Sequence, residues 1–426
     1  MRTAFTEDQL ADPDFAASRA AIRKCVHCGF CQATCPTYVL LGDERDSPRG
    51  RIELIKAMLE AGGAPSQETV RHVDRCLSCL ACKTTCPSGV DYAQLIDHGR
   101  AHIEAHYRRP LPERWLRALI PAVLTRPARL TAALALGRLA RPLEPMLRTL
   151  NLTSLAALLR LVPEPACSPQ RGVGTYIAEG VARGRVALLQ GCVEPAIAPR
   201  IREAAIRLLS RAGFDVELVA GEGCCGALSE HLGRTEEAKA MAARNVRVWS
   251  RAGPFDAIVT TAAGCGTTLK AYGHRLAHYP ALATEAARVG FVTRDILEFI
   301  GEVGLPPVTN RTALVVAYHA ACSLQHGQGV TTTPARLLAQ AGFEVRPIAE
   351  GHLCCGSAGV YNILQPKLAA QLRDRKASHI AKTGAVVVAA GNIGCIAQLA
   401  PALATPIVHP VELLDWATGG PRPASV

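Results

Sequence analysis

A chain of 426 residues is long enough for two to four domains, and 49% hydrophobic residues lets each domain bury a core, which excludes a disordered protein. Its 17 cysteines are too dilute for a disulfide-stapled scaffold, and eight of them lie in two tight groups typical of metal ligands, so a reducing compartment is expected. The formal charge of +11 comes with only 4% aromatic residues and no stacking motif, so no nucleic-acid partner is expected.

The sequence predicts neither a secretory signal nor a membrane span. The N-terminal segment carries acidic residues and lacks an apolar core, unlike a signal peptide. The longest run without a formal charge, residues 383–411, is interrupted by Gly391, Pro401 and Pro406, so it is not continuously apolar. We therefore expect a cytoplasmic protein without a transmembrane segment.

A cysteine motif occurs twice near the N-terminus, at an offset of 51 residues. Cys-x2-Cys-x2-Cys-x3-Cys-Pro spans residues 25–36 and again residues 76–87. Between the two copies, Ser47-Pro48 precedes an apolar pattern that ends at Gly62, which predicts a capped amphipathic helix. Residues 1–105 are therefore predicted to form a helical di-cluster domain of the ferredoxin type.

This motif resembles the run of bacterial ferredoxins, in which the fourth cysteine ligates the other cluster. It predicts two 4Fe-4S clusters, the first on Cys25, Cys28, Cys31 and Cys86, and the second on Cys76, Cys79, Cys82 and Cys35. Zinc is the rival metal, but structural zinc sites normally take their ligands as two separated pairs. Four cations flank the runs and either stabilise the reduced clusters or lie solvated at the surface: Arg23, Lys24, Arg75 and Lys83.

The next segment, residues 106–180, is predicted to be a basic helical connector. Residues 100–164 contain eleven arginines and no lysine, together with many leucines. Prolines break the apolar pattern into short amphipathic helices. We interpret the segment as packed against the neighbouring domains, with a docking surface for a partner or an anionic membrane as the alternative.

A second repeat, at an offset of 130 residues, fills the rest of the chain. Its cysteines are Cys192, Cys224, Cys225 and Cys265 in the first copy, and Cys322, Cys354, Cys355 and Cys395 in the second. Each copy alternates short apolar segments with helical patterns, which indicates a mostly parallel sheet. We predict two α/β Cys-Cys-Gly domains, residues 181–305 and 306–426, and an α+β multidomain protein overall.

Each copy of the second repeat carries a Cys-Cys-Gly loop. Adjacent cysteines do not pair comfortably with each other, so we expect both copies to converge on a site. Packing about a pseudo-twofold axis would bring the two sets of four cysteines together beside the ferredoxin domain, as the site of a third iron-sulfur centre with ligands from one domain or from both. The alternative is that they are buried free cysteines in close-packed turns.

Other residues carry weaker signals. No Gly-x-Gly-x-x-Gly, P-loop or Gly-x-Ser-x-Gly motif occurs, so neither a flavin, nicotinamide or ATP site nor a catalytic residue is predicted. Cys167 lies alone and receives no functional interpretation. Five histidines near the cysteine motifs either line a quinone or cofactor pocket or are ordinary hydrogen-bonded residues: His27, His231, His319, His326 and His352.

A ferredoxin-type domain followed by two Cys-Cys-Gly domains resembles heterodisulfide reductase subunits and their relatives, including anaerobic glycerol-3-phosphate dehydrogenase subunits. Within that group, the chain is most similar to the glycolate oxidase iron-sulfur subunits. The longer strings that carry this resemblance span residues 25–52, 86–92, 109–117 and 352–363. One departure is that heterodisulfide reductase domains end in Cys-x2-Cys, whereas Cys265 and Cys395 each stand alone here.

The resemblance implies that flavoprotein subunits oxidise glycolate to glyoxylate and pass the electrons to this chain. The chain would relay them towards a quinone or membrane acceptor, and it would hold no substrate site. A peripheral location on the inner face of the cytoplasmic membrane is consistent with that role.

Two alternatives stay open. An equivalent subunit serves glycerol-3-phosphate or lactate dehydrogenation, and the co-purifying flavoproteins distinguish these cases. A zinc-stabilised basic binding protein belongs to a different class, and a brown colour with broad visible absorbance would exclude it.

Overall fold

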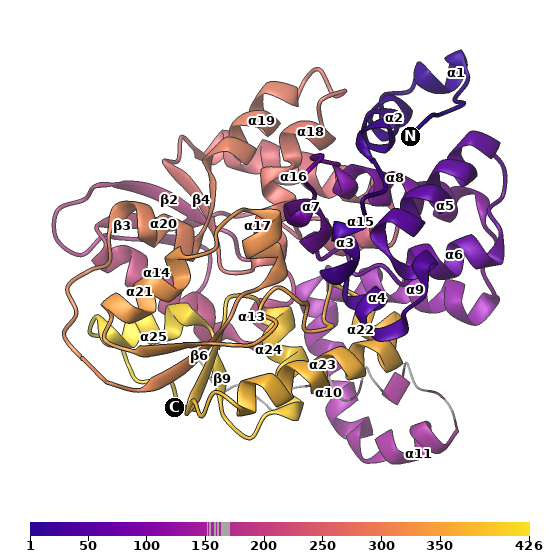
Figure 1. Cartoon of the computed structure of the whole chain (residues 1–426). Helices are drawn as coiled ribbons and strands as arrows, with labels where there is room; N and C mark the ends of the chain where they lie inside the picture. The colour runs from indigo at the N-terminus through magenta and orange to yellow at the C-terminus, as the bar shows by residue number, and fades with distance from the viewer. Residues whose placement is uncertain (151, 153–154, 157–158, 160–161, 163–170) are drawn as a thin grey trace.

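The computed structural model describes residues 1–150, 152, 155–156, 159, 162 and 171–426, and Cys167 lies outside them. The N-terminal helices lie at the right of Figure 1, and the two sheets lie to the left. The chain is an α+β multidomain protein with two separate sheets, as the sequence predicted.

The N-terminal part is helical. Its elements are α1 Glu7–Leu10, α2 Pro13–Lys24, α3 Phe30–Ala33, α4 Pro36–Leu41, η1 Glu44–Asp46, α5 Pro48–Ala61, α6 Gln67–Asp74, α7 Ala81–Thr85 and α8 Tyr92–His106. Helices α2 and α5 pack against α8 around the fully buried Ile22, Ile55 and Leu95. The predicted helix α5 is confirmed, because the Ser47 side chain caps its first turn and Gly62 ends it in a left-handed conformation.

The two ferredoxin-type runs share an unusual backbone. His27 and Gly29 have positive φ angles, and so do Ser78 and Leu80, which lie 51 residues later. Residues other than glycine rarely adopt this conformation. Its recurrence at matched positions shows that the turn geometry is repeated even where the residue type is not.

The connecting segment folds into helices that touch both later domains. Its elements are α9 Leu111–Leu124, α10 Pro127–Ala140, η2 Arg141–Leu143 and α11 Glu144–Thr149. Ile120 of α9 packs against Leu232, Val360 and Ile363. In the described part of the chain, no single helix is long and apolar enough to cross a membrane. Leu111–Leu124 and Pro127–Leu147 reach that length and composition only together, across a bend of 113°.

Two sheets follow, and they share one topology apart from the additional edge strand β1 of the first. The strands are β1 Gly174–Tyr176, β2 Gly184–Leu188, β3 Phe214–Leu218, β4 Ala257–Thr260 and β5 Thr293–Asp295 in one sheet, and β6 Val315–His319, β7 Glu344–Pro347, β8 Val387–Ala390 and β9 Ile407–Val408 in the other. The orders are β1-β3-β2-β4-β5 and β7-β6-β8-β9, with only β1 antiparallel to its neighbour. The predicted parallel sheets are therefore confirmed in both copies of the repeat.

Helices cover these sheets. Those of the first copy are α13 Glu194–Ile197, α14 Pro199–Arg211, α15 Ala227–His231, α16 Thr235–Ala252, α17 Ala263–Lys270, α18 Tyr272–Arg275, α19 Ala283–Val292 and α20 Ile296–Val303. Those of the second are η3 Ser323–Gly327, α21 Thr333–Gln340, α22 Tyr361–Leu364, α23 Pro366–Ala381, α24 Ile393–Leu399, η4 Ala400–Ala402 and α25 Pro410–Ala417.

The two sheet domains share one continuous apolar core. Helix α14 packs against α25 of the second domain, and α21 of the second domain packs against α20 of the first. Since α14 and α21 occupy the same place in their folds, as do α20 and α25, these reciprocal contacts confirm the predicted pseudo-twofold arrangement. Polar contacts cross the boundary as well: His409 Nε2 lies 2.9 Å from Thr261 O, and the Thr267 hydroxyl donates to Ser323 O over 2.9 Å.

Candidate metal centres

Cys35 of the first run lies with the cysteines of the second run. Burial raises the pKa of the Cys82 thiol well above its usual value, and the nearby sulfurs of Cys79, Cys76 and Cys35 raise it further, followed by Cys31 of the first run. Buried thiols this close together ionise only when a positive charge compensates them, and a metal supplies that charge. The set Cys76, Cys79, Cys82 and Cys35 is the grouping that crossed ligation requires.

The other ferredoxin-type group lies nearer to solvent. Cys25 is buried, Cys31 and Cys86 are half-buried, and Cys28 is exposed. Burial raises the pKa of Cys31 to about 11, and the nearby sulfurs of Cys25 and then Cys35 add to the effect, so Cys35 lies between the two groups. A cluster on this group would therefore face the protein surface more openly than one on the Cys35 group.

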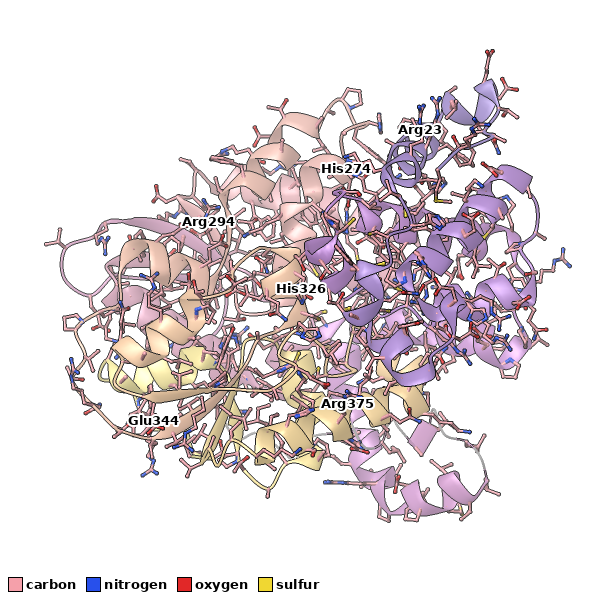
Figure 2. All side chains as sticks on the ribbon, viewed as in Figure 1. Arg23, His274, Arg294, His326, Glu344 and Arg375 are labelled. Carbon is pink, nitrogen blue, oxygen red and sulfur yellow. The ribbon has the colours of Figure 1, made fainter. Side chains whose placement is uncertain are left out.

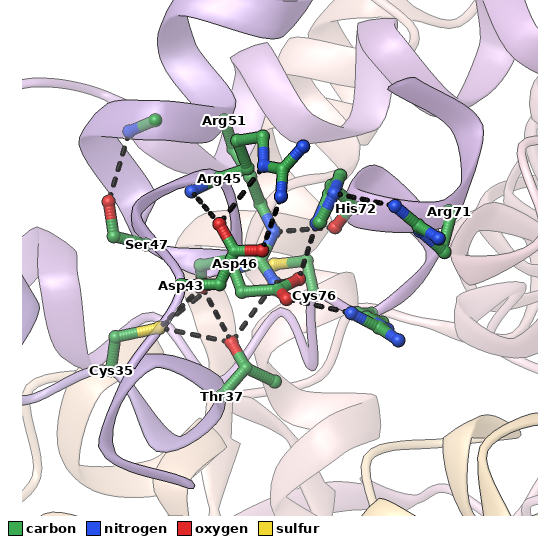
Figure 3. A network of polar contacts seen from close by, with 12 residues as sticks. Cys35, Thr37, Asp43, Arg45, Asp46, Ser47, Arg51, Arg71, His72 and Cys76 are labelled. Carbon is green, nitrogen blue, oxygen red and sulfur yellow. Dashed lines mark hydrogen bonds and ion pairs between the residues drawn. The ribbon is translucent and has the colours of Figure 1, made fainter. Parts of the chain in front are cut away.

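A buried arginine, Arg51, faces the Cys35 group. It is 1% exposed, and its Nη1 lies 3.8 Å from Cys35 Sγ. Figure 3 shows the surrounding network, in which Arg51 also donates to Thr37 Oγ1 over 3.0 Å and to the carbonyl oxygen of His72 over 2.7 Å. The buried carboxylate of Asp46 lies 3.3 Å from Arg51 Nη2 and 3.0 Å from His72 Nδ1. The guanidinium is thus fixed from several sides.

The charge of Arg51 is retained in spite of burial. Burial alone would lower its pKa, but the anionic forms of Cys76, Tyr92 and Cys35 outweigh that effect, and the pKa is raised. A fixed cation of this kind stabilises an anionic centre on the neighbouring sulfurs. The donor chemistry therefore fits an iron-sulfur cluster at the Cys35 group.

Sequence reasoning flagged other cations and missed Arg51. Arg23 and Lys24 are exposed, and Figure 2 shows Arg23 at the outer edge of the N-terminal helices. Arg75 pairs with Asp46 over 2.8 Å, and Lys83 pairs with Asp91 over 3.2 Å. The available signal was that Arg51 stands one helical turn before Ile55, on the buried face of α5.

The two Cys-Cys-Gly loops adopt the same conformation. Gly226 and Gly356 have φ angles of 93° and 90°, and each donates its N–H to the sulfur two residues earlier, Cys224 Sγ over 3.5 Å and Cys354 Sγ over 3.4 Å. The sulfurs of Cys225 and Cys265 are 3.3 Å apart. In the second loop, the sulfurs of Cys322 and Cys354 are 3.9 Å apart.

Seven of the eight cysteines of the second repeat border one cavity of about 1040 Å³, an arrangement that is consistent with the predicted convergence, and Cys355 is not among its lining residues. Apolar side chains of the connector, such as Ile120 and Leu134, also line it. Cys79 of the ferredoxin-type domain packs with Cys354 and Cys322 in one apolar cluster. The cysteines lining the cavity are Cys192, Cys224, Cys225, Cys265, Cys322, Cys354 and Cys395.

The flagged histidines fall into different classes. His27 and His326 make ordinary contacts, His27 with Met1 Sδ at 2.8 Å and His326 with Thr84 Oγ1 at 2.7 Å. Figure 2 shows His326 at the boundary between the N-terminal helices and the second sheet domain. Burial, with Arg100 next, lowers the pKa of His231 to about 3, and His352 is exposed.

His319, at the end of β6, lies among cysteines. One of its ring nitrogens and the sulfurs of Cys355 and Cys395 all lie within 4.8 Å of one another. It is therefore the one flagged histidine that shares a candidate metal site with thiols among the described residues.

Similarity to known proteins agrees with this geometry. Residues 21–90 match the family model of the 4Fe-4S dicluster domain, and residues 186–270 and 316–400 each match that of the cysteine-rich domain. A crystal structure of a hypothetical protein from Helicobacter pylori shares the fold, with a TM-score of 0.51, 9% identity, and coverage of 88% of this chain and 73% of that chain.

Two curated relatives match almost end to end. The glycolate oxidase iron-sulfur subunit of Escherichia coli (strain K12) is 38% identical over 98% of this chain and 99% of its own length. The probable glycolate oxidase iron-sulfur subunit of Bacillus subtilis (strain 168) is 32% identical over 88% of this chain and 87% of its own. With both domain types matched at the expected positions, the chain belongs to the family of glycolate oxidase iron-sulfur subunits.

Proposed function

We propose that this chain is the electron-transfer subunit of a glycolate oxidase, an oxidoreductase complex that converts glycolate to glyoxylate. Its ferredoxin-type cysteines would hold two 4Fe-4S clusters with crossed ligands, and each bound cluster takes up and gives up one electron. The observation that carries the proposal is the grouping of Cys35 with the sulfurs of the second run, beside a buried cation.

The residues of this chain hold and tune the clusters, and the substrate chemistry belongs to partner subunits. Flavoproteins would oxidise glycolate, and a quinone or another membrane acceptor would receive the electrons. The contact between Cys79 and the second Cys-Cys-Gly loop supports a route from the ferredoxin-type domain into the sheet domains, where we place a third iron-sulfur centre.

The connector helices support docking on the inner face of the cytoplasmic membrane. Large apolar side chains are exposed on them, including Trp115 at 73%, Leu136 at 68% and Leu139 at 81%. Exposed Arg126 and Arg129 lie at the start of α10. Apolar side chains beside arginines are the composition of helices that lie in the interface of an anionic bilayer.

Reconstitution tests the proposal. The full chain, purified anaerobically with its co-expressed flavoprotein subunits, is expected to be brown and to support glycolate-dependent reduction of a quinone. The chain alone should not oxidise glycolate with an artificial acceptor. Turnover by the chain alone would refute the relay function, activity with lactate or glycerol-3-phosphate but not glycolate would favour the sister subunits, and a colourless zinc protein would refute the electron-transfer class.

A further inference from the structure

The second sheet domain contains a donor set that the first lacks. His319 is 2% exposed, and neither of its ring nitrogens has a hydrogen-bond partner in the described part of the chain. An unpaired buried imidazole is costly. Its neighbours are the sulfurs of Cys355 and Cys395, which are themselves 1% and 2% exposed. A ligand that binds nitrogen and sulfur together would satisfy all three groups.

The 130-residue repeat supplies an internal comparison. The position of His319 is occupied in the first domain by Leu189, a core residue that is 4% exposed. Each domain keeps its four cysteines, so the imidazole is an addition to the thiol set rather than a substitute within it. The residue at the end of β2 therefore packs in the apolar core of the first domain, whereas the equivalent residue at the end of β6 in the second domain is a potential metal ligand.

A second difference lies in charge. Lys376 of α23 is 3% exposed and lies near the sulfurs of Cys355, Cys354 and Cys395, and its Nζ donates to the carbonyl oxygen of Glu350 over 2.6 Å. The matching residue of the first domain is Val246, which is fully buried. A cation beside the second set compensates the negative charge that a metal centre on several thiolates carries. The first set has no such cation at this position.

The donors of the second domain fall into two groups. Cys322 and Cys354 form one pair, with sulfurs 3.9 Å apart, and His319 lies with Cys355 and Cys395 in the other. Five donors exceed the four that a structural zinc ion takes. A four-iron cluster with one protein ligand per iron also takes four, so His319 would have to share an iron with one of the cysteines, as two protein ligands share an iron in Rieske centres. Imidazole ligands occur in iron-sulfur clusters and raise their reduction potential.

We infer that the second Cys-Cys-Gly domain alone binds the third centre, an iron-sulfur cluster held by Cys322, Cys354, Cys355 and Cys395 with His319 as a nitrogen ligand. This deepens the proposed function, on which it rests, by assigning the site to one domain and one mixed ligand set. The cysteines of the first domain are then structural. The site adjoins Cys79 of the ferredoxin-type domain.

The test uses the full chain reconstituted anaerobically with ferrous iron and sulfide. The unaltered chain should hold about twelve irons, about eight of them in the ferredoxin-type clusters, and pulsed EPR should detect a histidine nitrogen coupled to the additional centre. His319→Leu copies the first domain and should lower the iron content to about eight. His319→Cys should restore the iron without the nitrogen coupling.

The repeat also provides matched controls. Cys354→Ser should remove the additional centre, whereas Cys224→Ser, at the equivalent position of the first domain, should leave about twelve irons and the nitrogen signal in place. A ceiling of about eight irons, zinc at the site, or a nitrogen coupling that survives His319→Cys would overturn the inference. Absence of the ferredoxin-type clusters would count against the proposed function instead, while the nitrogen coupling still decides the ligand assignment.

Discussion

Replacement of Arg51 tests the crossed arrangement through a redox potential. Its Nη1 lies 3.8 Å from Cys35 Sγ, and at an effective dielectric constant of 20 a unit charge at that separation contributes about 4 kcal/mol. A cluster spreads its charge over several sulfurs, so we take about half of that value, about 2 kcal/mol, or roughly 90 mV for one electron. Arg51→Met should therefore lower the potential of the cluster on the Cys35 group by roughly 90 mV.

Redox titration followed by EPR measures the two ferredoxin-type clusters separately. Arg51→Lys keeps the charge and should shift the potential much less, and Arg23→Met removes an exposed arginine and should leave both potentials nearly unchanged. A shift confined to the cluster built on Cys25, or no shift in Arg51→Met, would refute the placement of Cys35.

The same substitution has a separate cost in stability. Asp46 is fully buried, so loss of Arg51 leaves its carboxylate with fewer charged partners and should lower the free energy of unfolding by about 3 kcal/mol or more. The double variant Arg51→Met with Asp46→Asn removes the pair together and should recover part of that loss. Thermal unfolding of the holo chain compares the two, and equal destabilisation would contradict the importance of the pair.

Three further predictions follow from the described sites. Cys35→Ser should damage the cluster on the second run and Cys86→Ser the cluster on the first, as resolved by EPR, whereas damage within the same run would refute crossed ligation. Burial raises the pKa of Glu222 to about 7, so the folded chain keeps a proton that the unfolded chain loses near pH 4.5. Stability should fall by up to about 3 kcal/mol as pH rises from about 4.5 to 7. Glu222→Gln should reduce that pH dependence in thermal unfolding, and an unchanged pH dependence in this variant would contradict the prediction. Charge reversal at the start of α10, by Arg126→Glu and Arg129→Glu, should weaken binding to anionic vesicles by about 1 kcal/mol per residue in a salt-dependent way. Unchanged binding would leave these helices with a connecting role only.

The sequence repeats predicted most of the architecture because spacing survives where residue types change. The 51-residue offset located both ferredoxin-type turns, and the 130-residue offset located both sheets and their loops. Through the resemblance to bacterial ferredoxins, spacing also predicts that Cys35 ligates the cluster of the second run, and this stays a prediction.

Two features of the sites depend on tertiary contacts: Arg51, which sequence reasoning missed, and the metal-ligand character of His319, which was named only as one of five histidines. Arg51 looks like a surface residue in a helix, because only the packed domain shows that its guanidinium has buried partners to satisfy it. His319 ends an apolar strand, and its meeting with Cys355 and Cys395 joins the ends of three segments far apart in the sequence. A comparison of the two copies position by position shows Leu189 in its place, but His326 and His352 also align with residues other than histidine, Ala196 and Glu222, so the sequence alone does not distinguish His319.

The contact between α14 and α25 has a consequence for how this chain can be shortened. Arg207 and Arg211 of α14 pair with Asp415 of α25, which is 1% exposed. The C-terminal helix of the second copy, α25, thus covers α14 of the first copy, and in the same way α20 of the first copy packs against α21 of the second. Each copy has apolar surface that only the other copy buries, so the two domains are expected to fold as a single cooperative unit. A truncation after residue 400 would uncover both halves at once and would not leave an intact first domain.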